Sequence, residues 1–137
     1  MTMAYKIIDI EGVGEAYAPK LTSAGVVKVD DLLAKCATPK GRAALAEETG
    51  ISEKLILRWT NHADLFRIKG VGPQFAELLE AAGVDTVKEF RHRVAENLVQ
   101  KMLETNDAKK LVRRVPSVKE VAKMIAQAKE LKPVVTY

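Results

Sequence analysis

The sequence is poor in cysteine, aromatic residues and long apolar runs, and each shortage excludes a class of protein. Cys36 is the single cysteine among 137 residues, so no disulfide can form within the chain. Aromatic residues make up 5% of the sequence, and no stretch approaches the roughly 20 apolar residues of a membrane span. The start of the chain lacks the apolar run of a signal peptide. We therefore expect a cytoplasmic protein with no membrane partner.

Patterns that would support catalysis or metal binding are also missing. His62 and His92 have no cysteine or histidine at the spacing that metal ligands need. No nucleophile with a neighbouring general base can be recognised. We therefore predict that the protein is not an enzyme and uses no catalytic residue, metal, cofactor or small-molecule substrate.

Helix-forming residues and charge, by contrast, are abundant. Charged residues make up 29% of the chain, and Ala, Leu, Glu and Lys are frequent, which favours helix over sheet. The net charge of +4 is uneven, because residues 1–67 hold nine basic and nine acidic side chains, whereas residues 68–137 hold 13 and nine. A basic half indicates an anionic partner, although a solvated helical surface would carry the same excess.

A five-residue frame occurs twice, as IEGVG at 10–14 and IKGVG at 68–72. Residues 10–32 align with 68–90 without a gap, and ten of the 23 positions are identical. This repeat predicts an internal duplication. We expect one repeat in residues 1–67 and the other in 68–137, packed together as a single compact unit.

The repeated frame continues into the following helix in the same way in both copies. Ala18 and Leu21 follow the first turn, and Ala76 and Leu79 follow the second at the same spacing. An apolar residue, a Gly-apolar-Gly turn, then Ala and Leu on one helix face are typical of a helix-hairpin-helix motif. The sequence therefore predicts an all-α fold of two helix-hairpin-helix pseudo-repeats, similar to SAM domains and to the N-terminal domain of DNA polymerase β.

Local signals predict where several helices begin. Thr38, Thr86 and Ser117 each have the pattern of a helix N-cap, whereas Lys28 stands where Thr86 stands in the second repeat, so the first repeat has lost that cap. The chain after the last helix, 132–137, is expected to be a loose end. Two helices have a predicted apolar face, formed by Leu55, Ile56, Trp59, Ala63 and Phe66 in one and by Val118, Val121, Ala122, Ile125 and Ala128 in the other.

The GVG turn suggests what the repeat could bind. Its glycines allow a tight turn, after which the backbone N–H groups at the start of the next helix form a site for an anion such as a DNA phosphate. Glu11 and Glu15 flank the first turn and would repel phosphate, whereas basic residues precede the second. We therefore expect sequence-independent DNA binding through the second turn. The candidate phosphate-binding residues are Arg67, Lys69, Gly70, Val71, Gly72, Gln74, Arg113 and Arg114.

Other interpretations stay open at this point. Both hairpins could be architectural, in a module that binds a protein partner instead of DNA. The basic side chains near Arg113, including Lys109 and Lys110, could form a phosphate track or could pair with neighbouring acids such as Glu104. The spacing of Ala46, Gly50 and Ile56 is also that of a DNA-reading helix-turn-helix, although this half of the chain has no net positive charge.

Several stretches together resemble a known family over nearly all of residues 6–137. They are IEGVGEAYAPKL, LAEETGISEKLILRWTNHADLFRIKGVG, LLEAAGVDTVKEF, LVRRVPSV and AKELKPVVTY. The chain is similar to the bacterial family called domain of unknown function 4332. This resemblance implies tandem hairpin modules like those of DNA repair and recombination proteins, and it supplies no catalytic residue.

Overall fold

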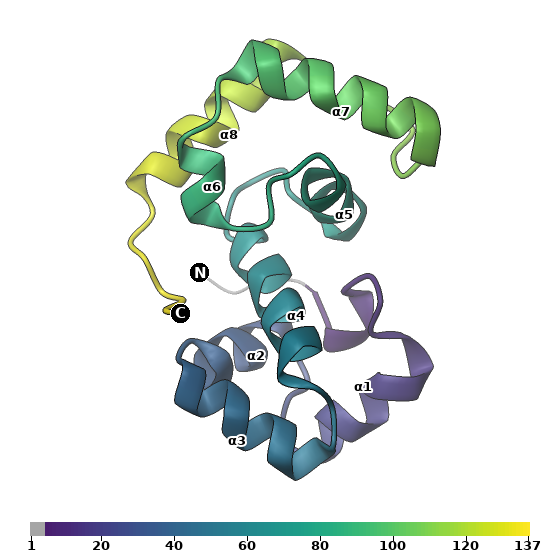
Figure 1. Ribbon diagram of the computed structural model, residues 1–137, viewed down its shortest axis with the longest axis vertical. Coiled ribbons are helices and arrows are strands. Elements are labelled where there is room, and N and C mark those ends of the chain that lie inside the picture. The colour runs from purple at the N-terminus through teal and green to yellow at the C-terminus, as the bar shows by residue number, and fades with distance from the viewer. Residues whose placement is uncertain (1–4) are drawn as a thin grey trace. The chain divides into compact units, whose positions relative to one another are not determined.

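The computed structural model describes residues 5–137, and within this range the protein is all-helical, as predicted (Figure 1). No strand occurs among these residues, apart from an isolated bridge between Lys6 and Lys28. The elements are η1 (Ile7–Asp9), α1 (Gly14–Ser23), α2 (Val29–Cys36), α3 (Pro39–Thr49), α4 (Glu53–Leu65), α5 (Pro73–Ala81), α6 (Val87–Arg91), α7 (Ala95–Lys109) and α8 (Val118–Glu130).

The helices form two compact units, each with one GVG turn. The first unit runs to Asp64 and also contains Pro133–Tyr137, and the second unit is Leu65–Lys132. The predicted repeat boundary between residues 67 and 68, and the packing of both repeats as one unit, stay predictions. None of the described helices is long and apolar enough to cross a membrane.

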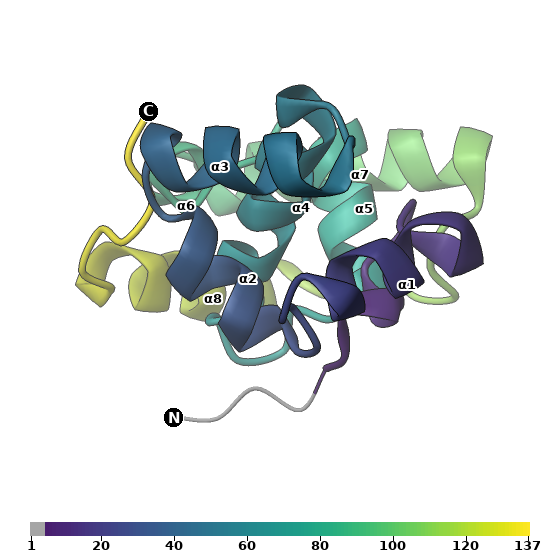
Figure 2. The ribbon, with the colours of Figure 1, turned by 90° about the horizontal axis from the view of Figure 1, so that it is seen from below.

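In the first unit, η1 packs on α1, and α2 packs on α3 (Figure 2). Ile56, Trp59 and Ala63 of α4 are fully buried, which confirms the centre of the predicted apolar face, whereas Leu55 is half-buried. Polar side chains on the other faces of α4 are buried as well, among them Thr60 and Asn61. This burial could not be predicted from the sequence, because polar residues on a helix normally indicate a solvent-facing side.

In the second unit, α6 and α7 both pack on α8, and α5 packs on α7 (Figure 1). Leu78, Phe90, Leu98 and Met102 are among the fully buried residues of this core.

The buried face of α8 differs from the predicted one. Val121, Ile125 and Ala128 are buried as predicted, and Met124 is buried with them. Val118 and Ala122 are exposed, so their assignment to this face was wrong. Successive residues in an α-helix turn by about 100°, which places Met124 closer than Ala122 to the centre of the face. Val118 begins the helix, beyond the edge of the core.

The predicted helix caps are present. Thr38, Thr86 and Ser117 each accept a hydrogen bond from the backbone N–H three residues later, at 3.2, 3.0 and 3.2 Å. Glu120 completes a capping box by accepting from the Ser117 N–H at 3.1 Å. These helix starts could be predicted because each cap depends on only four consecutive residues.

The start of α2 has lost only half of its cap. Lys28 supplies no oxygen, but the Asp31 carboxylate accepts from the backbone N–H groups of Lys28 and Val27 at 3.0 and 3.1 Å. These two hydrogen bonds lower the pKa of the Asp31 carboxyl below its usual value, the Lys28 bond most strongly. The acid three residues into the helix therefore replaces part of what threonine would provide.

The C-terminal tail is held in place, so the expectation of a loose end was wrong. The backbone N–H of Thr136 donates to the Ala37 carbonyl at 2.7 Å, and the buried Arg42 guanidinium donates to the Thr136 carbonyl at 2.7 Å. The Tyr137 hydroxyl donates to the Asn61 side chain, also at 2.7 Å. These bonds depend on residues distant in the sequence, so nothing local in the tail could predict them.

Candidate nucleic-acid interface

The second GVG turn has an exposed tip and a buried valine side chain. The Val71 N–H donates to the Ile68 carbonyl at 3.1 Å, and the Val71 side chain is buried. Gly70 lies in the left-handed region with φ of +96°, where L-residues with a side chain are strained. Lys69 and Gly70 are exposed, so the tip of the turn is open to a ligand.

Several backbone N–H groups of this turn and of the start of α5 have no acceptor among residues 5–137, among them those of Gly70, Gly72 and Gln74. The Lys69 N–H is the exception, because it donates to the Gln127 side chain at 3.0 Å. The first turn of α5 contains no acidic residue. Unused N–H groups at the positive end of a helix suit an anion.

Helix α8 supports the turn from one side. A Cβ added to Gly70 would lie 3.0 Å from the Met124 Cε, so the Met124 side chain packs directly against the turn. Gln127, one helical turn further along α8, is the residue that accepts from Lys69. The sequence did not indicate either contact, because each joins residues more than 50 positions apart.

Two of the predicted cations already have partners. Both terminal nitrogens of Arg67 donate to the Lys132 carbonyl at 3.2 Å. Arg114 forms a two-point ion pair with Glu120, at 3.0 and 3.1 Å. This pair and the hydrogen bonds from Ser117 lower the pKa of Glu120 to about 2. The side chains of Lys69 and Arg113, in contrast, have no partner among the described residues.

The structure brings Gln74 and Arg113 together. Both line an open hollow of about 630 Å³ between the start of α5 and the segment that follows α7. Lys110 adds a second cation to the lining, and Asp107 adds a carboxylate. The remaining lining residues are Asn106, Leu111 and Val112. Thus two of the predicted site residues meet in one place, beside the second GVG turn.

Asn106 gives the far wall of the hollow its shape. Its side-chain oxygen accepts from the backbone N–H groups of Leu111 and Val112 at 2.8 and 3.0 Å, and its amide nitrogen donates to the Val112 carbonyl at 2.9 Å. Lys110, the residue directly after α7, has φ of +52°. Sequence reasoning missed this use of Asn106, since nothing in the residues around it indicates a loop that folds back on its side chain.

A protein-family model described as "Domain of unknown function (DUF4332)" matches residues 11–131, which include both GVG turns and the hollow. The chain belongs to this family. The resemblance noted in the sequence is therefore confirmed. No match was found among curated proteins or among solved structures.

The first GVG turn of this DUF4332 protein has a different setting. A Cβ added to Gly12 would lie 3.6 Å from both the Arg58 Nη1 and the Trp59 Nε1. Trp59 is fully buried and packs against Tyr17, with ring centroids 5.2 Å apart. Sequence reasoning placed Trp59 in the core correctly but gave no indication that Arg58 reaches this turn.

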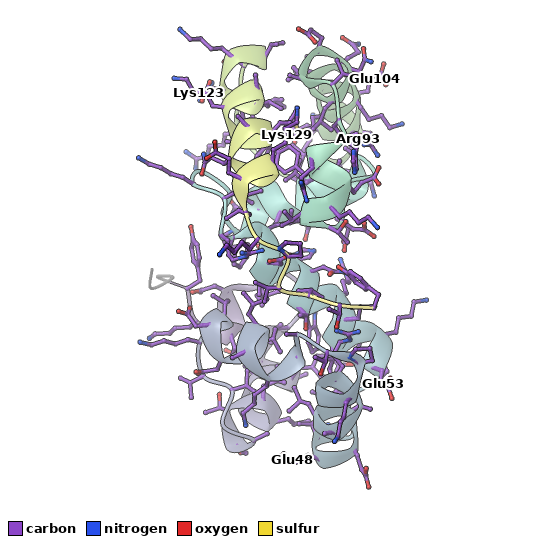
Figure 3. All side chains as sticks on the ribbon, turned by 90° about the vertical axis from the view of Figure 1, so that its left-hand side faces the viewer. Glu48, Glu53, Arg93, Glu104, Lys123 and Lys129 are labelled. Atoms are coloured by element: carbon purple, nitrogen blue, oxygen red, sulfur yellow. The ribbon has the colours of Figure 1, made fainter. Side chains whose placement is uncertain are left out.

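The α3–α4 segment of the DUF4332 chain has acidic side chains beside its turn. Glu48 precedes the turn at Gly50 and Glu53 follows it, and both are exposed (Figure 3). Carboxylates here would repel DNA phosphates, and most of α4 beyond its first turns is buried. This geometry favours a structural role for the segment over DNA reading.

Other basic side chains of the second unit are engaged or lie apart from the hollow. Arg93 pairs with Glu89 at 2.8 Å and also donates to the Gly83 carbonyl. Lys123 and Lys129 extend from the exposed side of α8 (Figure 3). Among residues 5–137, no group of three His, Cys, Asp or Glu side chains is placed to hold a metal ion.

Proposed function

We propose that the two GVG turns are the hairpins of tandem helix-hairpin-helix motifs, and that the second hairpin binds DNA through its backbone phosphates. The observation that carries the proposal is the set of unused N–H groups of Gly70, Gly72 and Gln74 in an exposed turn without acids. A phosphate oxygen can accept from such groups without reading any base, so binding would be independent of sequence.

Two cations would strengthen this phosphate contact. Lys69 belongs to the turn itself, and Arg113 reaches the hollow beside Gln74. Arg67 and Arg114 would contribute less, because a carbonyl and a carboxylate already occupy them. Each phosphate neutralised releases counterions, so the affinity should fall steeply as salt rises.

The test is fluorescence anisotropy with labelled single-stranded, duplex and branched DNA, at about 50 and about 200 mM salt. We expect salt-sensitive binding that Lys69→Glu weakens about tenfold or more at the lower salt. Lys40→Glu is the matched control, since it makes the same charge change on the exposed side of α3 in the first unit. Equal binding by both variants, or no binding of any DNA at low salt, would refute the proposal.

A second candidate function is protein binding through the first unit, with both hairpins purely structural. An open hollow of about 700 Å³ there is lined mainly by apolar atoms, and its lining includes Ile8 and Val27, which are 43% and 46% exposed. Exposed apolar side chains around a hollow are typical of interaction surfaces. A photo-crosslinking residue at Val27 should capture a discrete partner, whereas the same residue at the exposed Ala34 should not.

A further inference from the structure

We infer that the hollow beside the second GVG turn takes an unpaired nucleotide of the bound DNA. The inference rests on the proposed function and names its preferred substrate: DNA with an unpaired base, such as a bulge, gap or branch, in place of fully paired duplex. The hollow, at about 630 Å³, falls within the usual size of pockets for small ligands.

The lining of the hollow offers one kind of group for each part of a nucleotide. The lining is mainly polar, and Leu111 and Val112 supply its smaller apolar part, against which a base could pack. The Gln74 amide can both donate to and accept from a base edge. Lys110 and Arg113 provide positive charge for the attached phosphate. A fully paired base could not enter, because its Watson–Crick edge is occupied by pairing and both its faces are occupied by stacking within the duplex.

Asp107 distinguishes this site from a simple anion site. Its carboxylate lies in the same lining as Lys110 and Arg113, and it would repel a free phosphate. A carboxylate is, however, a good acceptor for the exocyclic amino group of adenine, cytosine or guanine, which thymine lacks. The hollow should therefore prefer an unpaired amino-bearing base over an unpaired thymine.

Gln74 connects the hollow to the phosphate site. Its backbone N–H belongs to the unused group at the start of α5, and its side chain lines the hollow. A strand whose phosphate contacts the turn would therefore have its next nucleotide near the hollow. The unpaired nucleotide and the phosphate contact belong to the same strand in this arrangement.

The backbone conformation of Lys110 is unusual for a residue with a side chain. Among residues 5–137, it is the one non-glycine residue with positive φ. Glycine is the usual residue in this conformation at a helix end. A lysine at this position is more strained than a glycine would be, but it supplies a positive charge to the hollow.

The experiment compares two DNA duplexes, one fully paired and one identical to it except for a single additional, extrahelical 2-aminopurine. Anisotropy should show about five- to tenfold tighter binding of the bulged duplex, in the range that one or two polar base contacts provide. The 2-aminopurine fluorescence should change on binding, as its surroundings change. Replacing 2-aminopurine with thymine should remove most of the preference.

Two matched pairs of variants assign the effect to the hollow. Asp107→Asn should reduce the discrimination between adenine and thymine bulges, whereas Glu104→Gln, one turn earlier on the exposed side of α7, should leave it unchanged (Figure 3). Lys110→Gly should weaken binding of the bulged duplex while raising the midpoint of denaturation, since glycine suits the positive φ. Lys109→Gln removes an adjacent charge outside the lining and should retain the preference.

The outcomes separate this inference from the function on which it depends. Equal binding of bulged and paired duplex, with no fluorescence change, would refute the inference and leave phosphate binding standing. A bulge preference that survives both Asp107→Asn and Lys110→Gly would also refute it, because the preference would then arise elsewhere. No binding of either duplex would refute the proposed function and this inference together.

Discussion

The two GVG turns of this protein begin with the same backbone conformation but have very different surroundings. Gly12 and Gly70 have φ of +95° and +96°, and the valine N–H donates to the isoleucine carbonyl at 3.1 Å in both turns. The first turn lies against Arg58 and Trp59, whereas the second lies against Met124. The repeated residues therefore specify the turn, and the residues around it decide what can approach it.

The helices that follow the turns also start differently. Helix α1 begins at Gly14 itself, with φ of +56°, whereas Gly72 is extended and α5 begins at Pro73. A proline disfavours helical conformation in the residue before it, which explains the extended Gly72. Glu15 lies in the first turn of α1, so a carboxylate is already close to that positive helix end.

Exchanging the flanks of the two turns should have the largest effect. Lys69→Glu with Pro73→Glu gives the second turn the acidic flanks of the first, and we expect DNA affinity to fall about 100-fold at about 50 mM salt. The two added carboxylates repel a phosphate at this turn, and the loss of Lys69 removes an attraction at the same place. Fluorescence anisotropy would measure the loss, and circular dichroism would confirm that the helices remain.

The reciprocal exchange tests the comparison from the other side. Glu11→Lys with Glu15→Pro gives the first turn the flanks of the second, in a protein whose second turn has been made acidic. Partial recovery of salt-sensitive binding would show that the flanks alone separate the two turns. Undiminished DNA binding by the protein with the acidic second turn would exclude that turn as the phosphate site.

The glycines should be equally important for the stability of the two turns. Gly12→Ala and Gly70→Ala each force a side chain into the left-handed region, at a cost of about 1–2 kcal/mol in the free energy of unfolding. The Met124 Cε near Gly70 is the end of a flexible side chain and can move aside, so it adds little. Urea denaturation would measure both losses, and DNA binding should suffer only in Gly70→Ala. Equal loss of binding in the two variants would contradict the assignment.

The features that the sequence predicted are those that depend on neighbouring residues. The all-helical class, the caps at Thr38, Thr86 and Ser117, and the apolar face of α4 around Trp59 are confirmed. Each of them follows from short-range hydrogen bonding or from helical spacing, which a single sequence displays. The face of α8 was wrong at Ala122, where helical spacing itself favours Met124, and at Val118, which begins the helix beyond the edge of the core.

The candidate site was accessible to sequence reasoning only in part. Gln74 and Arg113 were named from the sequence, but their meeting in one hollow depends on how α5 packs on α7. The pairing of Arg114 with Glu120 could have been suspected, since the two residues are six positions apart around a capping box. The hydrogen bond from Lys69 to Gln127 could not, because it joins distant segments.

The helix caps give a smaller test of the difference between the repeats. Lys28→Thr would supply the oxygen that Thr86 supplies in the second repeat, and we expect about 0.5–1 kcal/mol of added stability. Lys28→Ala removes the same charge without adding an acceptor and is the control. The pKa of Asp31 is lowered below its ordinary value of 3.8. The contribution of this carboxylate to stability is therefore present at pH values above 3.8 and is lost as the pH falls below it. Unfolding curves at neutral and acid pH would measure the effect of the new cap and the contribution of Asp31. Equal stability of Lys28→Thr and Lys28→Ala would contradict the prediction that threonine caps this helix.

The smallest predicted effect concerns the ion pair that occupies Arg114. Glu120→Gln should retain the capping box, since a glutamine oxygen still accepts from the Ser117 N–H, but it releases the guanidinium. We expect DNA affinity to rise about twofold, with a steeper salt dependence. Glu130→Gln removes the same charge from the exposed end of α8 and is the control. If both variants raise the affinity equally, net charge explains the gain and Arg114 does not.

The same ion pair should have a visible pH dependence in the wild-type protein. The pKa of Glu120 lies at about 2, below the ordinary 4.5, so its contribution to stability is complete above about pH 4.5 and is lost as the pH falls towards 2. Glu120→Gln should lack this part of the acid transition, whereas Glu130→Gln should retain it. At neutral pH the carboxylate is fully charged and continues to hold Arg114. The second turn would therefore depend on Lys69 and Arg113 for the positive charge that attracts a phosphate. This dependence distinguishes it from the first turn, which glutamates flank.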